Sequence, residues 1–231
     1  MAPARILGNF ALALLFMIPT ASIAEGTHEE DPTSGAKGTW EEVAHKEGIK
    51  VWRLDIPGET LPGFRGEGTI AAPAAAVLRE IQRVEHHTEW MDRCAEARRI
   101  ETIDQNTHIV YNRTDSPWPA WDRDVVVKTT VSRANDGKEL KLSFQNTDAG
   151  YVPPQDGVVR MPRLEGAYTM TQVGPNETHV SYQVEVDIGG VIPGWIASMI
   201  ARDLPVKTLS ALRERVESMA TEQQPEQASA L

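Results

Sequence analysis

The sequence contains a single cysteine, Cys94, and this scarcity already excludes several fold classes. One thiol cannot form an intrachain disulfide, nor can it supply the paired cysteines of a zinc ribbon. The chain is therefore not a small domain held together by disulfides or metal. Its 231 residues, 41% of them hydrophobic, are enough to bury a sizeable core without such help.

Clusters of basic residues are also missing. The chain has 23 Lys and Arg against 33 Asp and Glu, which gives a net charge of −10. The densest basic stretch, Arg93 with Arg98 and Arg99, is interleaved with Glu96 and Glu101. Because an acidic surface repels phosphate backbones, we expect no nucleic-acid partner.

Familiar enzyme motifs are absent as well: there is no Gly-x-Ser-x-Gly, no phosphate-binding loop and no Gly-x-Gly-x-x-Gly. His86, His87, Glu89, Asp92 and Cys94 resemble metal ligands in type. However, two adjacent histidines point about 100° apart on a helix, and no second cluster at ligand spacing joins them. The sequence therefore predicts no metal site, no cofactor and no catalytic residue.

One long apolar run is present, over residues 6–18. Arg5 precedes it, and Pro19 and small residues ending at Ala24 follow, a pattern typical of a secretory signal peptide. The run is shorter than the roughly 20 residues that a spanning helix needs. We expect residues 1–24 to be cleaved near Ala24 and the protein to be exported, periplasmic or secreted. An uncleaved membrane anchor is the alternative.

Between residues 39 and 220 there is no linker-like stretch and no internal repeat, which favours one domain. The polar residues 25–38 predict a flexible lead-in, and residues 221–231 predict a disordered tail. Helical spacing predicts a short helix at Trp40–Lys46, a second from Pro73 to Met91 and a third from Pro193 to Ala220. Pro205 is expected to bend the last helix near Asp203.

Alternating apolar and polar residues indicate half-buried strands. The predicted strands are 51–56, 64–70, 108–113, 125–132, 140–146, 166–172 and 178–188. Gly66 and Gly68 in the second strand indicate a bend or a close backbone approach. Consecutive hairpins without intervening helices predict an antiparallel sheet and an α+β fold. A curved sheet of about seven to nine strands can grip the long last helix without filling its concave face, which leaves an apolar tunnel.

Three stretches resemble the START family, the lipid-transfer domains related to the steroidogenic acute regulatory protein. The first is Phe64–Ile70, which leads into the helix ending at Glu89-Trp90-Met91. The second is Ser116–Asp124, a Pro-rich loop that ends in an Arg-Asp pair before the strand Val125–Val127. The third is Gly189–Trp195, which opens the final helix. In order and at sensible spacing, they extend the resemblance over about residues 37–218.

The resemblance implies a helix-grip fold of the START and Bet v 1-like kind, with an internal cavity for one lipid or sterol-like ligand. Access in the family is attributed to the C-terminal helix and adjacent loops. On this sequence, the corresponding gate residues are Trp118, Trp121, Val191, Ile192 and Trp195. These loops imply a transient contact with a membrane surface; the alternative is that their tryptophans cap the core. We expect a monomer.

Cholesterol-binding members carry a buried acid–arginine pair, and the matching positions here are Val110 and Thr129, neither of them charged. Recognition of cholesterol through that pair is therefore not expected. Strand alternation around these positions predicts a cavity lining of His108, Val110, Asn112, Val125, Val127, Thr129 and Val131, with Met199 from the helix. The alternative is that these residues form a filled core. Arg123 and Asp124 are expected to fix their loop by hydrogen bonds; the alternative is that they contact the ligand.

The sequence thus favours a module that binds, and transfers or senses, one hydrophobic molecule. Two alternatives stay open. One is a cyclase-like enzyme on the same fold, with His108 or Tyr111 as its acid or base. The other is a scaffold whose cavity has collapsed and whose tryptophan loops bind a partner.

Overall fold

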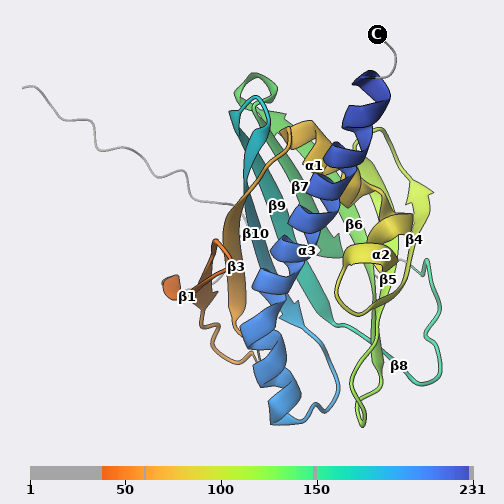
Figure 1. Cartoon of the computed structure of the whole chain (residues 1–231). Helices are drawn as coiled ribbons and strands as arrows, with labels where there is room; N and C mark the ends of the chain where they lie inside the picture. The colour runs from red at the N-terminus through yellow and green to blue at the C-terminus, as the bar shows by residue number, and fades with distance from the viewer. Residues whose placement is uncertain (1–37, 60, 148–149, 229–231) are drawn as a thin grey trace, which may run out of the picture. The chain divides into compact units, whose positions relative to one another are not determined.

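A computed structural model describes residues 38–59, 61–147 and 150–228, all within one compact unit, Gly35–Leu231. A ten-stranded sheet curves around the helix α3, Gly194–Ala228, which lies across one of its faces (Figure 1). Among these described residues, no helix is both long and apolar enough to cross a membrane. The predicted signal segment, residues 1–24, and most of the lead-in lie outside the described residues.

The strands run in the order β1-β2-β3-β10-β9-β7-β6-β5-β4, and neighbours along this path are antiparallel, as predicted. The last strand returns beside the third, which joins β1–β3 to the rest of one curved sheet with its edges at β1 and β4. The strands are β1 Glu41–Lys46, β2 Ile49–Leu54, β3 Gly63–Ile70, β4 Cys94–Thr102, β5 Thr107–Thr114, β6 Asp122–Ala134, β7 Glu139–Asn146, β8 Val158–Arg160, β9 Arg163–Gly174 and β10 Glu177–Asp187. The short β8, which the sequence did not predict, pairs with β6 in parallel.

The predicted helix at Trp40–Lys46 is wrong, because Glu41–Lys46 forms the edge strand β1. Its partner is β2, and the turn between them places Glu47 and Gly48 at φ of 56° and 70°. Positive φ at both central residues is the geometry of a tight hairpin turn. All β1 side chains are exposed, so no buried face was available to hold a helix there.

The helix predicted from Pro73 to Met91 is divided in three: α1 Ala74–Gln82, the 3₁₀ turn Val84–His86 and α2 His87–Trp90. The break falls at Arg83, whose φ of −80° and ψ of 71° are not helical. Val77, Ile81 and Val84 are nevertheless buried as their spacing predicted. The apolar pattern was therefore correct, and the interruption was missed.

The larger hydrophobic core lies between the concave face of the sheet and the part of α3 that follows Pro205. Gly66 and Gly68 on β3 allow the helix to come close. A Cβ on Gly66 would lie 3.0 Å from the Cβ of Pro205, and one on Gly68 would lie 2.9 Å from Nη2 of Arg213. These glycines therefore serve the predicted close approach. The helix continues through Pro205 and past the predicted end at Ala220, to Ala228.

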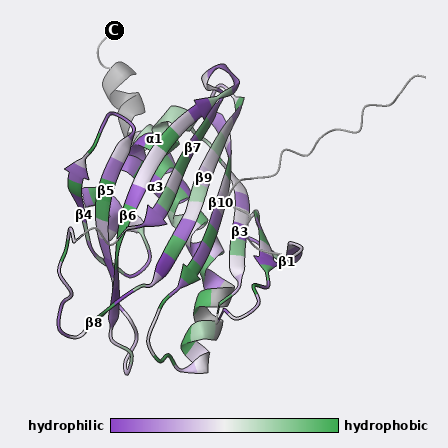
Figure 2. Cartoon of the chain, turned by 180° about the vertical axis from the view of Figure 1, so that it is seen from behind, coloured by the Kyte–Doolittle hydropathy of each residue, from purple (hydrophilic) through white to green (hydrophobic). Residues whose placement is uncertain are grey.

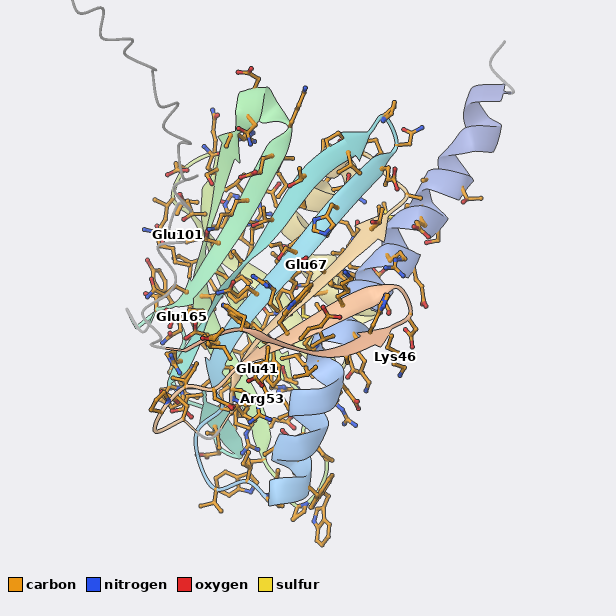
Figure 3. The ribbon with its side chains drawn as sticks, turned by 90° about the vertical axis from the view of Figure 1, so that its left-hand side faces the viewer. Glu41, Lys46, Arg53, Glu67, Glu101 and Glu165 are labelled. Atoms are coloured by element: carbon orange, nitrogen blue, oxygen red, sulfur yellow. The ribbon has the colours of Figure 1, made fainter. Side chains whose placement is uncertain are left out.

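Hydrophilic and hydrophobic residues alternate along the strands, as the view from behind shows (Figure 2). A smaller apolar cluster of Ile109, Tyr111, Val126 and Val152 covers the face of β5 and β6 that is turned away from α3. Glu101 and Glu165 also lie on the side away from α3 (Figure 3). Each strand of this region thus presents one face to the helix and the other to solvent or to the covering loop.

Candidate ligand-binding pocket

A pocket of about 280 Å³ lies between the sheet and the N-terminal half of α3. Its walls come from β5, β6, β7, β9 and β10, from α1 and α2, and from the first turns of α3. Most of its lining surface is apolar, and α3 contributes Ile196, Ile200, Leu204, Lys207 and Thr208. This is the arrangement that the curved sheet and long helix predicted: the helix covers the sheet without filling the whole concave face.

Two neighbouring strands form a continuous wall of the pocket. In the register of β5 and β6, the facing pairs His108–Thr129, Val110–Val127, Asn112–Val125 and Thr114–Arg123 all border it. Six of the lining residues predicted from the sequence are among them, namely His108, Val110, Asn112, Val125, Val127 and Thr129. That these side chains contact a ligand stays a prediction.

Val131 and Met199 have different outcomes. Val131 is buried, but it packs in the larger core and does not border the pocket, because the long strand β6 runs past the end of the pocket. The side chain of Met199 lies outside the described residues. The prediction that Val131 lines the pocket is therefore not supported by the structure.

Three aromatic side chains that the sequence analysis missed border the pocket: Phe144 on β7, Tyr168 on β9 and Tyr182 on β10. The two tyrosine rings are stacked, with centroids 4.6 Å apart, and Phe144 lies 6.1 Å from Tyr168. Burial raises the pKa of both tyrosine hydroxyls, so they remain protonated at neutral pH. Tyr168 and Tyr182 face each other across the β9–β10 hairpin, and extending the alternation argument to that hairpin would have found them.

His108 is buried, and its Nδ1 has no hydrogen-bond partner. Burial lowers the pKa of this imidazole, which favours its neutral form. A neutral imidazole at the pocket wall can donate or accept one hydrogen bond to a polar group of a bound molecule. Tyr111, the other candidate acid or base, lies on the opposite face. Its hydroxyl accepts a hydrogen bond from Nε2 of Gln155 at 3.0 Å.

The side chains that resembled metal ligands have other partners. His87 is buried, with Nε2 donating to the Ile81 carbonyl at 2.8 Å and Nδ1 3.4 Å from Nδ2 of Asn112. Burial lowers the pKa of His87. Asp92 pairs with Lys207 on α3. Within the described part of the chain, no group of three or more His, Cys, Asp or Glu is placed to hold a metal ion.

The predicted gate residues lie on two loops that reach the pocket, but their side chains face solvent. Trp118 is 88% exposed and Val191 is 96% exposed; Trp121 and Trp195 are also exposed, and Ile192 is half-buried. The pocket itself is bordered by residues beside them in the chain, Ser116, Pro117, Ile188 and Ile196. The loops are therefore positioned at the pocket, whereas the tryptophans do not close it.

Hydrogen bonds of Arg123 hold these loops, as predicted, whereas the Asp124 side chain accepts hydrogen bonds from strand β8 instead. Asp124 accepts two hydrogen bonds from Arg160, at 2.7 and 3.0 Å, on the face turned away from the pocket. Arg123 donates to the carbonyl of Trp121 and to that of Gly189, so it connects both loops.

Comparison with known proteins agrees with this geometry. The START domain model matches residues 24–221. The chain belongs to the START domain family. It is 31% identical over 178 residues to an uncharacterized protein of Pseudomonas aeruginosa, covering 77% of this chain and 87% of that protein.

Two solved structures share the fold of this START domain. A STAR-related lipid transfer protein from Xanthomonas axonopodis superposes with a TM-score of 0.70 and 30% identity, over 77% of this chain and 98% of that one. Human StAR-related lipid transfer protein 5 gives a TM-score of 0.71 at 17% identity, over 78% and 88%. START domains bind lipids or other hydrophobic ligands, which is consistent with an apolar pocket under the C-terminal helix.

Proposed function

We propose that this START domain binds one lipid or sterol-like molecule in the pocket under α3 and transfers or senses it. The observation that carries the proposal is the apolar pocket of about 280 Å³ between the sheet and the helix. Ligand sites typically enclose about 300–1,000 Å³, and this volume, close to the lower end of that range, holds a single ligand of modest size. Burying its apolar surface would supply roughly 25 cal/mol per Å². The similar Xanthomonas structure carries the name of a lipid transfer protein.

Native mass spectrometry of residues 25–231 tests this proposal. Purified from its own compartment, or incubated with mixed sterols and phospholipids, the protein should carry one apolar molecule per chain. The variant Ile200→Trp should reduce this occupancy because the larger side chain occupies the pocket. Its control, Ile103→Trp, makes the same change on an exposed turn and should leave occupancy unchanged. A protein that stays ligand-free in both preparations would contradict the proposal.

Transfer requires contact with a membrane, and the two loops at the pocket supply exposed apolar side chains for it. We propose that Trp118, Trp121, Val191 and Trp195 touch a lipid surface transiently while the exported monomer loads or releases its ligand. Vesicle flotation with Val191→Ser should show weaker binding. The matched control Val173→Ser alters another exposed valine, on the β9–β10 hairpin, and should bind as the wild type does. Equal binding by both variants would remove Val191 from the contact.

A further inference from the structure

Arg123 is a buried cation on the pocket wall. Its side chain is only 6% exposed, and it borders the pocket. It shares a face of β6 with Val125 and Val127, two residues that also line the pocket, as strand alternation requires. The loop before β6 and the loop after β10 both fold against it.

The hydrogen bonds of Arg123 go to uncharged acceptors. Nη1 donates to the Trp121 carbonyl and to Oγ of Ser116 at 3.5 Å, and Nη2 donates to the Gly189 carbonyl at 3.5 Å. Nε is buried and has no partner. The guanidinium therefore keeps at least one donor available, and no acceptor in this set carries a negative charge.

The acids near Arg123 are engaged elsewhere. Asp124 points to the other face of β6 and pairs with Arg160. Asp122 accepts a hydrogen bond from the Ser116 backbone N–H at 3.1 Å and lies 3.8 Å from Nε of Arg113. In the parts of the chain that the structure describes, Arg123 has no carboxylate within ion-pair distance. Burial lowers its pKa, the direction expected for a desolvated cation, with Asp122 opposing the shift.

A buried charge without a counter-ion is costly, and proteins normally pair such groups. We propose that the ligand supplies this counter-ion: Arg123 binds the acidic group, a carboxylate or a phosphate ester, of a single-chain amphiphile. The inference rests on the proposed function, because it names the class of molecule held by the same pocket.

The rest of the wall fits such a ligand. Beyond Arg123 the wall is aliphatic at Val125, Val127 and Val110, apart from Asn112 opposite Val125, and it becomes polar again at His108 and Thr129. Six residues of strand at about 3.3 Å each separate Arg123 from Thr129, which gives about 20 Å for the apolar chain.

Two acids also border the pocket. Asp92 is offset by Lys207, whose Nζ lies 3.1 Å from its carboxylate, and Asp115 is exposed to solvent. Neither is a counter-ion that the ligand would have to displace from Arg123.

The test uses three probes with the same chain: hexadecanoate, hexadecyl phosphate and hexadecanol. Titrated into the wild-type domain below their aggregation concentrations, at least one of the two anions should bind about tenfold or more tightly than the neutral alcohol. The anion with the higher affinity identifies the acidic group as carboxylate or phosphate. This comparison needs no variant, so it decides the matter even where a substitution prevents folding.

Variants then assign the preference to Arg123. Arg123→Gln should reduce the affinity for the anions to about that for hexadecanol, whereas Arg123→Lys, which keeps the charge, should retain part of the preference. The control Arg98→Gln makes the same charge change on the exposed side of β4 and should leave the preference intact. Cooperative denaturant unfolding of Arg123→Gln would show that the variant is folded.

The outcomes separate the inference from the proposed function. Equal affinity of the wild type for acid and alcohol, or an unchanged preference in Arg123→Gln, would overturn the role of Arg123 while leaving a ligand-binding pocket. Absence of binding by all three probes, together with a ligand-free protein in the native mass spectrum, would instead reject the proposed function itself.

Discussion

The two halves of α3 have different surroundings, although they form one uninterrupted helix. Val206, Leu209, Leu212 and Val216, all C-terminal to Pro205, pack into the larger core. N-terminal to Pro205, Ile196, Ile200 and Leu204 border the pocket, and Leu204 also packs against the larger core. One half therefore contributes to a filled core, whereas the other covers a space that a ligand can fill.

Polar contacts strengthen the contrast at the C-terminal half. Nε of Arg215 donates to Oε1 of Glu80 on α1 at 2.9 Å, and Glu80 is only 2% exposed. Arg213 donates to the carbonyls of Thr69 and Glu47 at 3.0 and 2.8 Å. The comparison teaches that the stability of the fold and the handling of a ligand can be assigned to different turns of the same helix.

The largest expected effect comes from truncating the same residue type in each half. Leu212→Ala removes a fully buried side chain and should lower the free energy of unfolding by about 2–5 kcal/mol. Leu204→Ala, at the pocket, should cost roughly 1 kcal/mol, because Leu204 is only half-buried and already borders a space. Denaturant unfolding measures both. Equal losses would show that the two halves contribute alike.

Whether each of these features could be predicted from the sequence depends on how far apart in the chain the residues in contact lie. The β5–β6 wall was predicted because alternation within a strand is local, and the family motifs fixed which face turns inward. Tyr168 and Tyr182 also follow this alternation, because they face each other across the β9–β10 hairpin on its inner face. Val131 was misplaced because alternation gives the face of a strand but not where along it a pocket ends.

Other features depend on contacts that the sequence pattern does not contain. The strand β1 has no buried face, so its pairing with β2 decides its conformation against a helical pattern. Arg123 was expected to hold a loop, which it does. Its position on the pocket wall, without an acidic partner, emerges only when the strands and both loops are assembled.

A second prediction concerns two ion pairs of α3. Arg215→Met should lower the free energy of unfolding by about 1–3 kcal/mol, because it leaves the buried Glu80 with only longer contacts to Arg83 and His86, at 3.6 and 3.7 Å. Lys207→Met breaks a pair whose side chains are almost half exposed and should cost less than about 1 kcal/mol. Thermal and denaturant unfolding compare them. A larger loss of unfolding free energy for Lys207→Met would show that the exposed pair stabilises the fold more than the buried pair does.

The pH dependence of stability tests the pocket side of the molecule, where the buried His87 borders the pocket. Burial lowers its pKa in the folded protein, so below about pH 6.5 the unfolded chain binds a proton more readily than the native state does. The stability due to neutral His87 is therefore complete above that pH and is lost as the pH falls. Glu80 and Glu85 nearby oppose this effect.

The variant His87→Gln should show a weaker loss of stability than the wild type between pH 7 and pH 5, measured by denaturant unfolding at each pH. Substituting the exposed His45 in the same way provides the control and should leave the pH dependence unchanged. Parallel curves for His87→Gln and the wild type would mean that His87 does not resist protonation in the fold.

The smallest expected effect is on the rate of ligand exchange and concerns Lys207, which lies just after Pro205 on α3 and borders the pocket. Lys207 and Asp92 both border the pocket, and their ion pair joins α3 to the segment after α2. If the pocket half of α3 moves when a ligand enters, Lys207→Met should accelerate ligand exchange by up to about fivefold, the factor that corresponds to an exposed pair of up to 1 kcal/mol. Stopped-flow displacement of a bound fluorescent lipid measures this rate. Faster exchange in Arg215→Met but not in Lys207→Met would instead place the opening motion in the C-terminal half, against the division of the helix argued above.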